Sequence, residues 1–129
     1  MLLFARILTW FQAVMFFIFG VWGFVDPQGL AALSEIGLPN ALAVAEFRSF
    51  YGGAAMGVAA LLIFAALKAR WNDALIVQIA IYGAIVAGRL IQWAAAGSLE
   101  SQTAKLLATE AISAALAWWA LRRRRFTNS

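Results

Sequence analysis

Residues 2–25 read LLFARILTWFQAVMFFIFGVWGFV, and this run decides the class of fold. Its only polar interruptions are Arg6, Thr9 and Gln12. A helix needs roughly 20 apolar residues to cross a bilayer, so the segment is long enough to span one. A secretory signal has a shorter apolar region that ends in a small-residue cleavage site, and no such pattern precedes Asp26. We therefore expect a retained transmembrane helix.

Three further apolar runs follow the first. Hydrophobic residues make up 64% of the 129-residue chain and charged residues 12%, which is outside the range of soluble domains. The chain is predicted to be all-α: a bundle of four transmembrane helices in up-down-up-down order, forming one integral membrane domain over residues 1–129. The predicted spans are about 3–25, 45–67, 74–96 and 103–121.

The longest connection, between the first two spans, is itself patterned. Asp26 is a candidate N-cap, Pro27 suits the first position of a helix, and Gly37 and Pro39 are typical of a stop. These signals predict a short interfacial helix that lies along the membrane surface.

Basic residues are distributed unevenly between the two sides of the predicted bundle. Seven fall on the side of the termini (Arg6, Lys68, Arg70 and Arg122 to Arg125), whereas Arg48 and Lys105 lie near helix ends on the other. Basic residues concentrate in the cytoplasmic loops of membrane proteins. The asymmetry predicts a multi-pass protein of the bacterial inner membrane with both termini in the cytoplasm.

Several classes of site are excluded by composition. The chain has no cysteine and no histidine. This removes thiolate and imidazole ligands and histidine acid–base catalysis, so we expect no metal site, no cofactor and no enzymatic activity. The basic cluster at the end of the last span is typical of a membrane anchor, and we expect membrane lipids rather than nucleic acid as partners.

Charged residues within the spans are the first candidates for a site, because an ion in hydrocarbon requires a partner or a wet cavity. Arg89 and Glu110 lie at matching depths, about 10 Å below the same boundary at 1.5 Å per residue, on adjacent antiparallel helices. Glu46 and Arg48 lie at the same end of the second helix. The sequence predicts a neutral cluster of these four charges.

Other polar and small residues recur at helical spacing around these charges. Polar side chains predicted to face the bundle interior are Tyr51, Gln78, Tyr82, Gln92 and Ser113, and small residues predicted to permit close helix packing are Gly53, Gly57, Ala80, Ala84 and Gly88.

These residues also carry a resemblance to a known family. Glu46-x-Arg48-x-x-Tyr51-Gly52-Gly53, then Gly57, Ala87-Gly88-Arg89 and Glu110, resemble the bacterial membrane-protein family called domain of unknown function 4345. The resemblance covers nearly the whole chain. It implies four spans and no assigned activity.

Two functions remain open at this point. The first is a non-enzymatic accessory or assembly subunit that acts through lateral helix contacts in a larger membrane complex. The second is a binder or carrier of a lipid headgroup, a quinone-like molecule or a small anion at the Glu46, Arg48, Arg89 and Glu110 cluster. The sequence leaves the oligomeric state undetermined.

Overall fold

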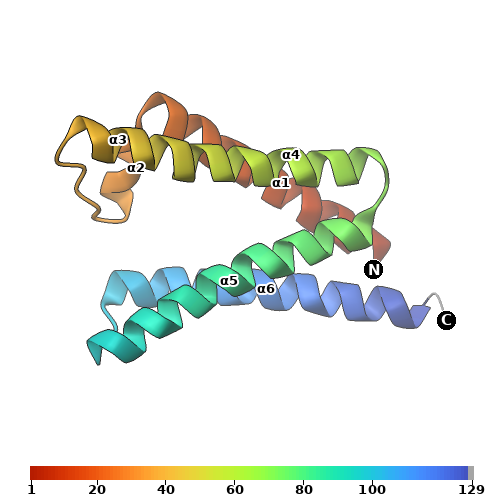
Figure 1. Cartoon of the computed structure of the whole chain (residues 1–129). Helices are drawn as coiled ribbons and strands as arrows, with labels where there is room; N and C mark the ends of the chain where they lie inside the picture. The colour runs from red at the N-terminus through yellow and green to blue at the C-terminus, as the bar shows by residue number, and fades with distance from the viewer. Residues whose placement is uncertain (128–129) are drawn as a thin grey trace. The chain divides into compact units, whose positions relative to one another are not determined.

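The computed structural model describes residues 1–127 and shows an all-α chain (Figure 1). No strand occurs within these residues, and the predicted all-α class is confirmed. The elements in chain order are α1 (Leu2–Val25), α2 (Pro27–Leu33), α3 (Ala41–Phe47), the π-helix η1 (Arg48–Gly52), α4 (Gly53–Leu67), α5 (Trp71–Ala96) and α6 (Ser101–Thr127).

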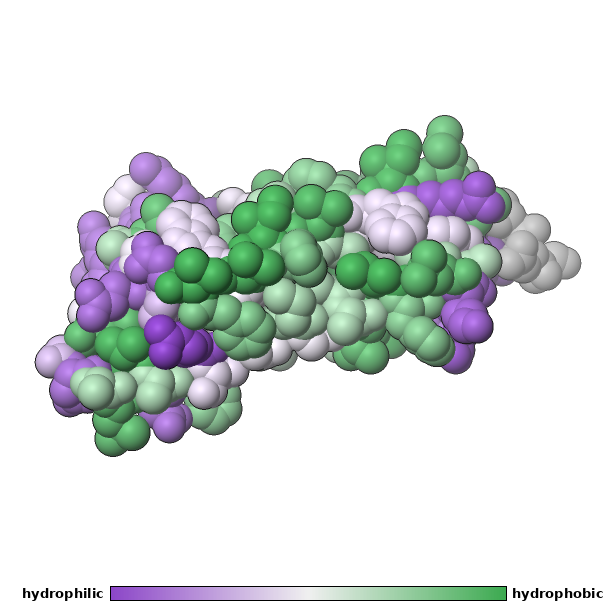
Figure 2. All heavy atoms as spheres, turned by 90° about the horizontal axis from the view of Figure 1, so that it is seen from above, coloured by the Kyte–Doolittle hydropathy of each residue, from purple (hydrophilic) through white to green (hydrophobic). Residues whose placement is uncertain are grey.

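Four helical segments are long and apolar enough to cross a membrane. They are α1, the continuous helix Ala41–Leu67 formed by α3, η1 and α4, then α5, and residues Ser101–Arg125 of α6. Large apolar side chains on them are exposed, as Figure 2 shows in green, and Val25 and Ile91 are 77% and 70% exposed. Lipid solvates such surface, whereas water does so only at a large cost in free energy. The chain is therefore a multi-pass membrane protein.

Each span extends beyond its predicted bounds, for local reasons. The second span begins at Ala41, because Asn40 Oδ1 accepts a hydrogen bond from Ala43 N at 2.9 Å and so caps the helix. The last span continues through the arginine cluster to Thr127, since arginine is a good helix former.

The chain forms two compact units. The α5–α6 unit contains Met1–Leu8 together with the chain from Arg70 onward, and the α1–α4 unit is Thr9–Ala69. Helix α1 contributes its first turns to the former and the remainder to the latter.

In the α5–α6 unit, the two long helices form an antiparallel hairpin joined by residues 97–100. Gly97 ends α5 with a φ of 75°, a left-handed conformation that favours glycine, and its N–H donates to Trp93 O at 2.9 Å. The buried residues gather near the start of α5 and the end of α6, and include Ala74, Leu75, Ala117 and Ala120.

In the α1–α4 unit, the predicted short helix after the first span is present as α2. Asp26 Oδ1 accepts a hydrogen bond from Gly29 N at 3.0 Å, and Pro27 occupies the first turn, as the sequence predicted. Leu30, Ala31 and Phe47 form a small apolar core between α2 and α3. This core fixes the connection from the end of α1 to the start of η1.

Helix α1 crosses the η1–α4 segment at glycines. A Cβ atom at Gly23 would lie 2.8 Å from Gly52 Cα, and one at Gly20 would lie 2.9 Å from Met56 N. Backbones approach this closely only where side chains are absent. The crossing lies at the π-helix, where the turns are wider than in an α-helix.

Candidate functional site

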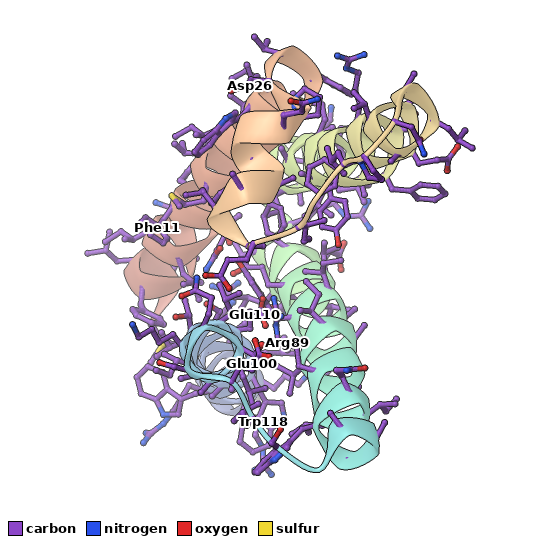
Figure 3. All side chains as sticks on the ribbon, turned by 90° about the vertical axis from the view of Figure 1, so that its left-hand side faces the viewer. Phe11, Asp26, Arg89, Glu100, Glu110 and Trp118 are labelled. Atoms are coloured by element: carbon purple, nitrogen blue, oxygen red, sulfur yellow. The ribbon has the colours of Figure 1, made fainter. Side chains whose placement is uncertain are left out.

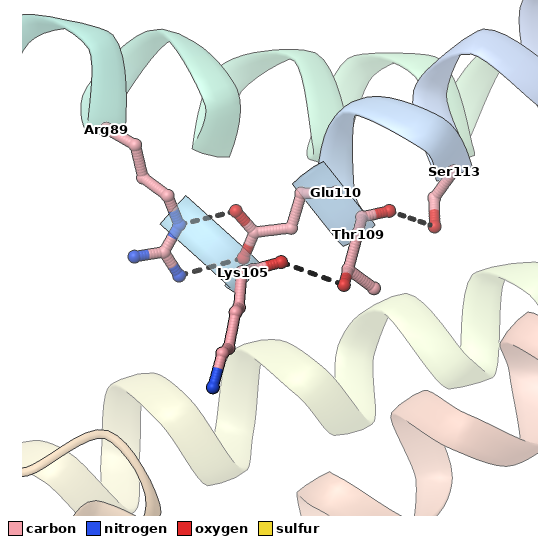
Figure 4. A network of polar contacts seen from close by, with 5 residues as sticks. All are labelled: Arg89, Lys105, Thr109, Glu110 and Ser113. Atoms are coloured by element: carbon pink, nitrogen blue, oxygen red, sulfur yellow. Dashed lines mark hydrogen bonds and ion pairs between the residues drawn. The ribbon is translucent and has the colours of Figure 1, made fainter. Parts of the chain in front are cut away.

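Arg89 of α5 and Glu110 of α6 form a bidentate ion pair (Figure 4). Arg89 Nη2 donates to Glu110 Oε1 at 2.8 Å, and Arg89 Nε donates to Glu110 Oε2. The two side chains are 28% and 14% exposed. The structure therefore contains the ion pair predicted from their matching depths.

The hairpin geometry explains why these two side chains meet. Helices α5 and α6 run antiparallel from a short turn, so residues at similar distances from that turn lie at about the same level. Arg89 is seven residues before Ala96 and Glu110 is nine residues after Ser101. Figure 3 shows Arg89 and Glu110 directed toward one another from the two helices. A planar guanidinium matches both carboxylate oxygens, which gives the pair a fixed orientation as well as attraction. The pair sets the register of α5 against α6 and leaves no net charge between them.

Hydroxyl groups surround the ion pair. Tyr82 of α5 is hydrogen-bonded to the side chain of Ser113 on α6. Ser113 Oγ also donates to Thr109 O at 3.0 Å, and Thr109 Oγ1 donates to Lys105 O at 3.0 Å (Figure 4). Bonds to the preceding turn satisfy a hydroxyl without water. The Tyr82–Ser113 bond and the Arg89–Glu110 pair together form a polar seam between the two helices, whereas the other two bonds lie within α6.

The other predicted polar residues of α5 lie on either side of this seam. Gln78 is fully buried, and its Nε2 donates to Ala74 O at 3.2 Å. Gln92 is exposed near the end of α5 that adjoins the turn. The predicted polar face of α5 is thus buried at Gln78, paired at Tyr82 and Arg89, and exposed at Gln92.

Glu46 and Arg48 belong to the α1–α4 unit. Arg48 Nε donates to Phe24 O at 3.0 Å, so the first residue of η1 is tied to the last turn of α1. Tyr51 stacks on Phe47 with ring centroids 4.2 Å apart. Glu46 is exposed and makes no ion pair with any residue in the range 1–127. The grouping of all four charges into one cluster stays a prediction.

Within the α1–α4 unit, close helix packing occurs at glycines that the sequence analysis did not select, while packing at the predicted small residues stays a prediction. Within its own unit, a Cβ placed at Gly53, Gly57 or Gly88 would meet no atom of another helix within 4 Å, and Ala80 and Ala84 are exposed on the α5–α6 unit. The residues that pack closely are Gly20, Gly23 and Gly52, together with Met56. The spacing Gly20-x-x-Gly23 within an apolar run was the signal that could have identified them.

The chemistry available at the ion pair is limited. Both oxygens of Glu110 accept hydrogen bonds from Arg89, so the carboxylate is already engaged within the hairpin. Within residues 1–127, no group of three or more acidic, histidine or cysteine side chains is placed to hold a metal ion. The arrangement is suited to fixing two helices together.

Of three comparisons with known proteins, only the comparison with family models found a match. No curated protein and no solved structure matches the chain. A family model does match, over residues 4–121, which include Arg48, Gly52, Arg89 and Glu110. The resemblance seen in the sequence is thereby confirmed, and the chain belongs to the family described as a domain of unknown function (DUF4345).

Proposed function

We propose that this small membrane protein is a non-enzymatic accessory or assembly subunit that binds a larger membrane complex through lateral helix contacts. The observation that supports the proposal is a ridge of small residues on α5. The ridge, Ala80, Ala84 and Gly88, follows a four-residue spacing and is exposed along its length. A Cβ at Gly88 would meet no atom of another helix of the α5–α6 unit within 4 Å.

An exposed small-residue ridge has a specific meaning in a bilayer. Lipid is as apolar as a leucine-rich helix surface, so helices associate in it through close packing and polar contacts. Small side chains at every fourth position let a second backbone approach along one face of the helix. The ridge on α5 is therefore suited to receive a helix of a partner protein.

The state of the Arg89–Glu110 pair also favours an accessory role. The two charges satisfy one another within the α5–α6 hairpin, which leaves the hairpin electrically neutral in the membrane. A site for an anion or a quinone-like ligand at these charges requires that the ligand displace bonds already formed. A binding role at the predicted four-charge cluster is accordingly the weaker alternative.

The proposed location is the bacterial inner membrane, with both termini in the cytoplasm. The support for this orientation is the seven-to-two distribution of basic residues between the two sides.

The ridge can be tested by filling it. We expect the double substitution Ala84→Leu and Gly88→Leu to abolish copurification of a stoichiometric partner in mild detergent, because the leucines would hold the partner backbone away. The α5–α6 hairpin itself should fold at least as well, since both positions are exposed on it and leucine is a better helix former than glycine.

Ala115→Leu on α6 is the matched control, because Ala115 is equally exposed and lies outside the ridge. The Ala115→Leu variant should still copurify with the partner. Retention of the partner by the filled ridge, with folding intact, would contradict the proposal.

A further inference from the structure

The two ends of the chain meet at an aromatic and basic corner of the α5–α6 unit. It is formed by the start of α1, the start of α5 and the end of α6, and Figure 1 shows the N-terminus and the end of α6 near one another. We use the name terminal corner for Arg6, Trp71, Trp118, Trp119, Arg122 and Arg123.

An arginine guanidinium lies over the ring of each of these tryptophans. The guanidinium carbon of Arg122 lies 4.6 Å from the ring centroid of Trp118, that of Arg123 lies 5.7 Å from Trp119, and that of Arg6 lies 5.4 Å from Trp71. Such distances are those of cation–π contacts. On α6 the pairs are four residues apart, so each arginine lies over the aromatic ring one turn before it.

Two of the three aromatic rings are held in place by the rest of the unit. Trp119 packs edge-on against Phe4 of α1, with centroids 5.5 Å apart, and Trp71 is only 8% exposed. Next to them, Arg124 Nε donates to Asn72 Oδ1 at 2.7 Å. The rings beneath Arg123 and Arg6 are thus fixed by packing in the unit, whereas Arg122 stacks on the exposed Trp118 of its own helix.

The terminal corner and its flanks are strongly positive. Arg6, Arg70 and Arg122 to Arg125 contribute six positive charges, and the carboxylate nearby in sequence is Asp73, which pairs with Arg70 at 2.6 Å. Trp118 and Trp119 are 51% and 42% exposed, and Arg122 and Arg123 are exposed as well. Exposed tryptophan and arginine at the end of a membrane span are characteristic of the headgroup region of a bilayer.

A stacked guanidinium keeps the directions of its donors. Stacking uses the face of the group, while the N–H bonds radiate in its plane and can engage two phosphate oxygens at once. A lysine ammonium carries the same charge without this planar fork. Because the rings restrict the arginines, less conformational entropy is lost when a phosphate binds.

We infer that the terminal corner is a binding site for anionic phospholipids, in which the Trp-stacked guanidinium groups of Arg122 and Arg123 hold the headgroup phosphate. Arg6 adds a third stacked cation from α1. The site recognises the geometry of the phosphate as well as its charge, and this distinguishes it from a simple basic anchor.

Native mass spectrometry of the full-length protein in mild detergent tests this inference. The probes are phosphatidylglycerol and, for comparison, zwitterionic phosphatidylcholine, each titrated into the micelles. We expect retention of phosphatidylglycerol in preference to phosphatidylcholine. The double substitution Arg122→Lys and Arg123→Lys should weaken phosphatidylglycerol binding about tenfold, since two stacked forks are lost while the charge is kept.

Two controls separate geometry from charge and from folding. Arg125→Lys alters an exposed arginine outside the corner and should leave binding unchanged. Trp118→Leu should weaken binding, whereas Trp93→Leu, at the other end of α5, should not. Equal retention of the two lipids, or unchanged phosphatidylglycerol binding by the double lysine variant, would overturn the inference. Neither result bears on the small-residue ridge.

Discussion

Arg89 and Glu110 are the residues whose substitution should have the largest effect on α5 and α6. Removing one partner leaves the other charge uncompensated between the helices. Because the side chains are 28% and 14% exposed, we expect Arg89→Leu or Glu110→Leu to lower the free energy of unfolding by roughly 2 to 4 kcal/mol, somewhat below the cost for a fully buried pair. Unfolding in mixed micelles titrated with SDS measures this loss.

The double variant, Arg89→Leu with Glu110→Leu, distinguishes a pair from two independent residues. An apolar pair can replace a buried ion pair, so the double variant should recover much of the loss. Additive losses from the two single changes would show that the contact contributes no coupling.

This ion pair could be predicted from the sequence, whereas the neighbouring contacts could not be fully predicted. Similar distances from a short turn bring Arg89 and Glu110 to about the same level of the two helices. The approach of Tyr82 to Ser113 depends on the rotation of each helix about its axis, which the spacing of polar residues defines only within a broad sector. The stacking of Arg122 and Arg123 on the preceding turn is an i,i+4 pattern that the sequence already contained, although its significance was missed.

Substitutions at the crossing of α1 with η1 and α4 should affect the packing of these helices against one another. A Cβ at Gly23 would lie 2.8 Å from Gly52 Cα and 2.9 Å from Gly52 N, and neither backbone atom can move independently of its helix. We expect Gly23→Ala to destabilise the fold by about 1 to 3 kcal/mol, as overpacking does in a well-filled interior. The measurement is again unfolding in mixed micelles.

Gly53→Ala and Gly57→Ala are the matched controls on the second span. No atom of the described chain lies within 4 Å of either added methyl group, so helix propensity alone should raise stability by up to about 1 kcal/mol. A loss at Gly57 equal to that at Gly23 would mean that the packing is not at the Gly23–Gly52 contact.

The π-helix η1 determines which glycine of the second span meets α1. With α-helical steps throughout, Ser49, Gly53 and Gly57 would share one face of the second span. A π turn contains an extra residue, so the face after η1 is displaced from the one counted before it. Gly52, the last residue of η1, therefore meets α1 instead. No residue in RSFYG is specific for a π-helix, and the shift could not be predicted.

At the scale of the whole molecule, the four apolar spans were predictable because length and hydrophobicity alone determine them. The short helix α2 was predictable from Asp26 and Pro27. The exact ends were not: the cap at Asn40 and the continuation through Arg122 depend on local hydrogen bonds and stacking. The division into two compact units depends on tertiary contacts, so no local sequence pattern could predict it.

The orientation of the chain in the membrane can be tested directly. Four spans place both termini on the same side, and the excess of basic residues predicts that this is the cytoplasmic side. A reporter that is active only in the cytoplasm should be active when fused after Ser129, and a periplasmic reporter there should be silent. The reverse pattern would refute the orientation while leaving the four spans intact.

The Arg89–Glu110 pair also has a consequence for biosynthesis. Arg89 enters the insertion machinery first, and its partner is made 21 residues later. An isolated arginine within a span opposes partition into lipid by up to about 3 kcal/mol, and α6 carries a charge of its own. The free-energy cost of placing either charge in lipid is therefore reduced only when α5 and α6 are both present and the ion pair can form. We expect α5 to wait at the protein-lined exit of the translocon until α6 has been synthesised, so that the hairpin is released into the bilayer as one piece.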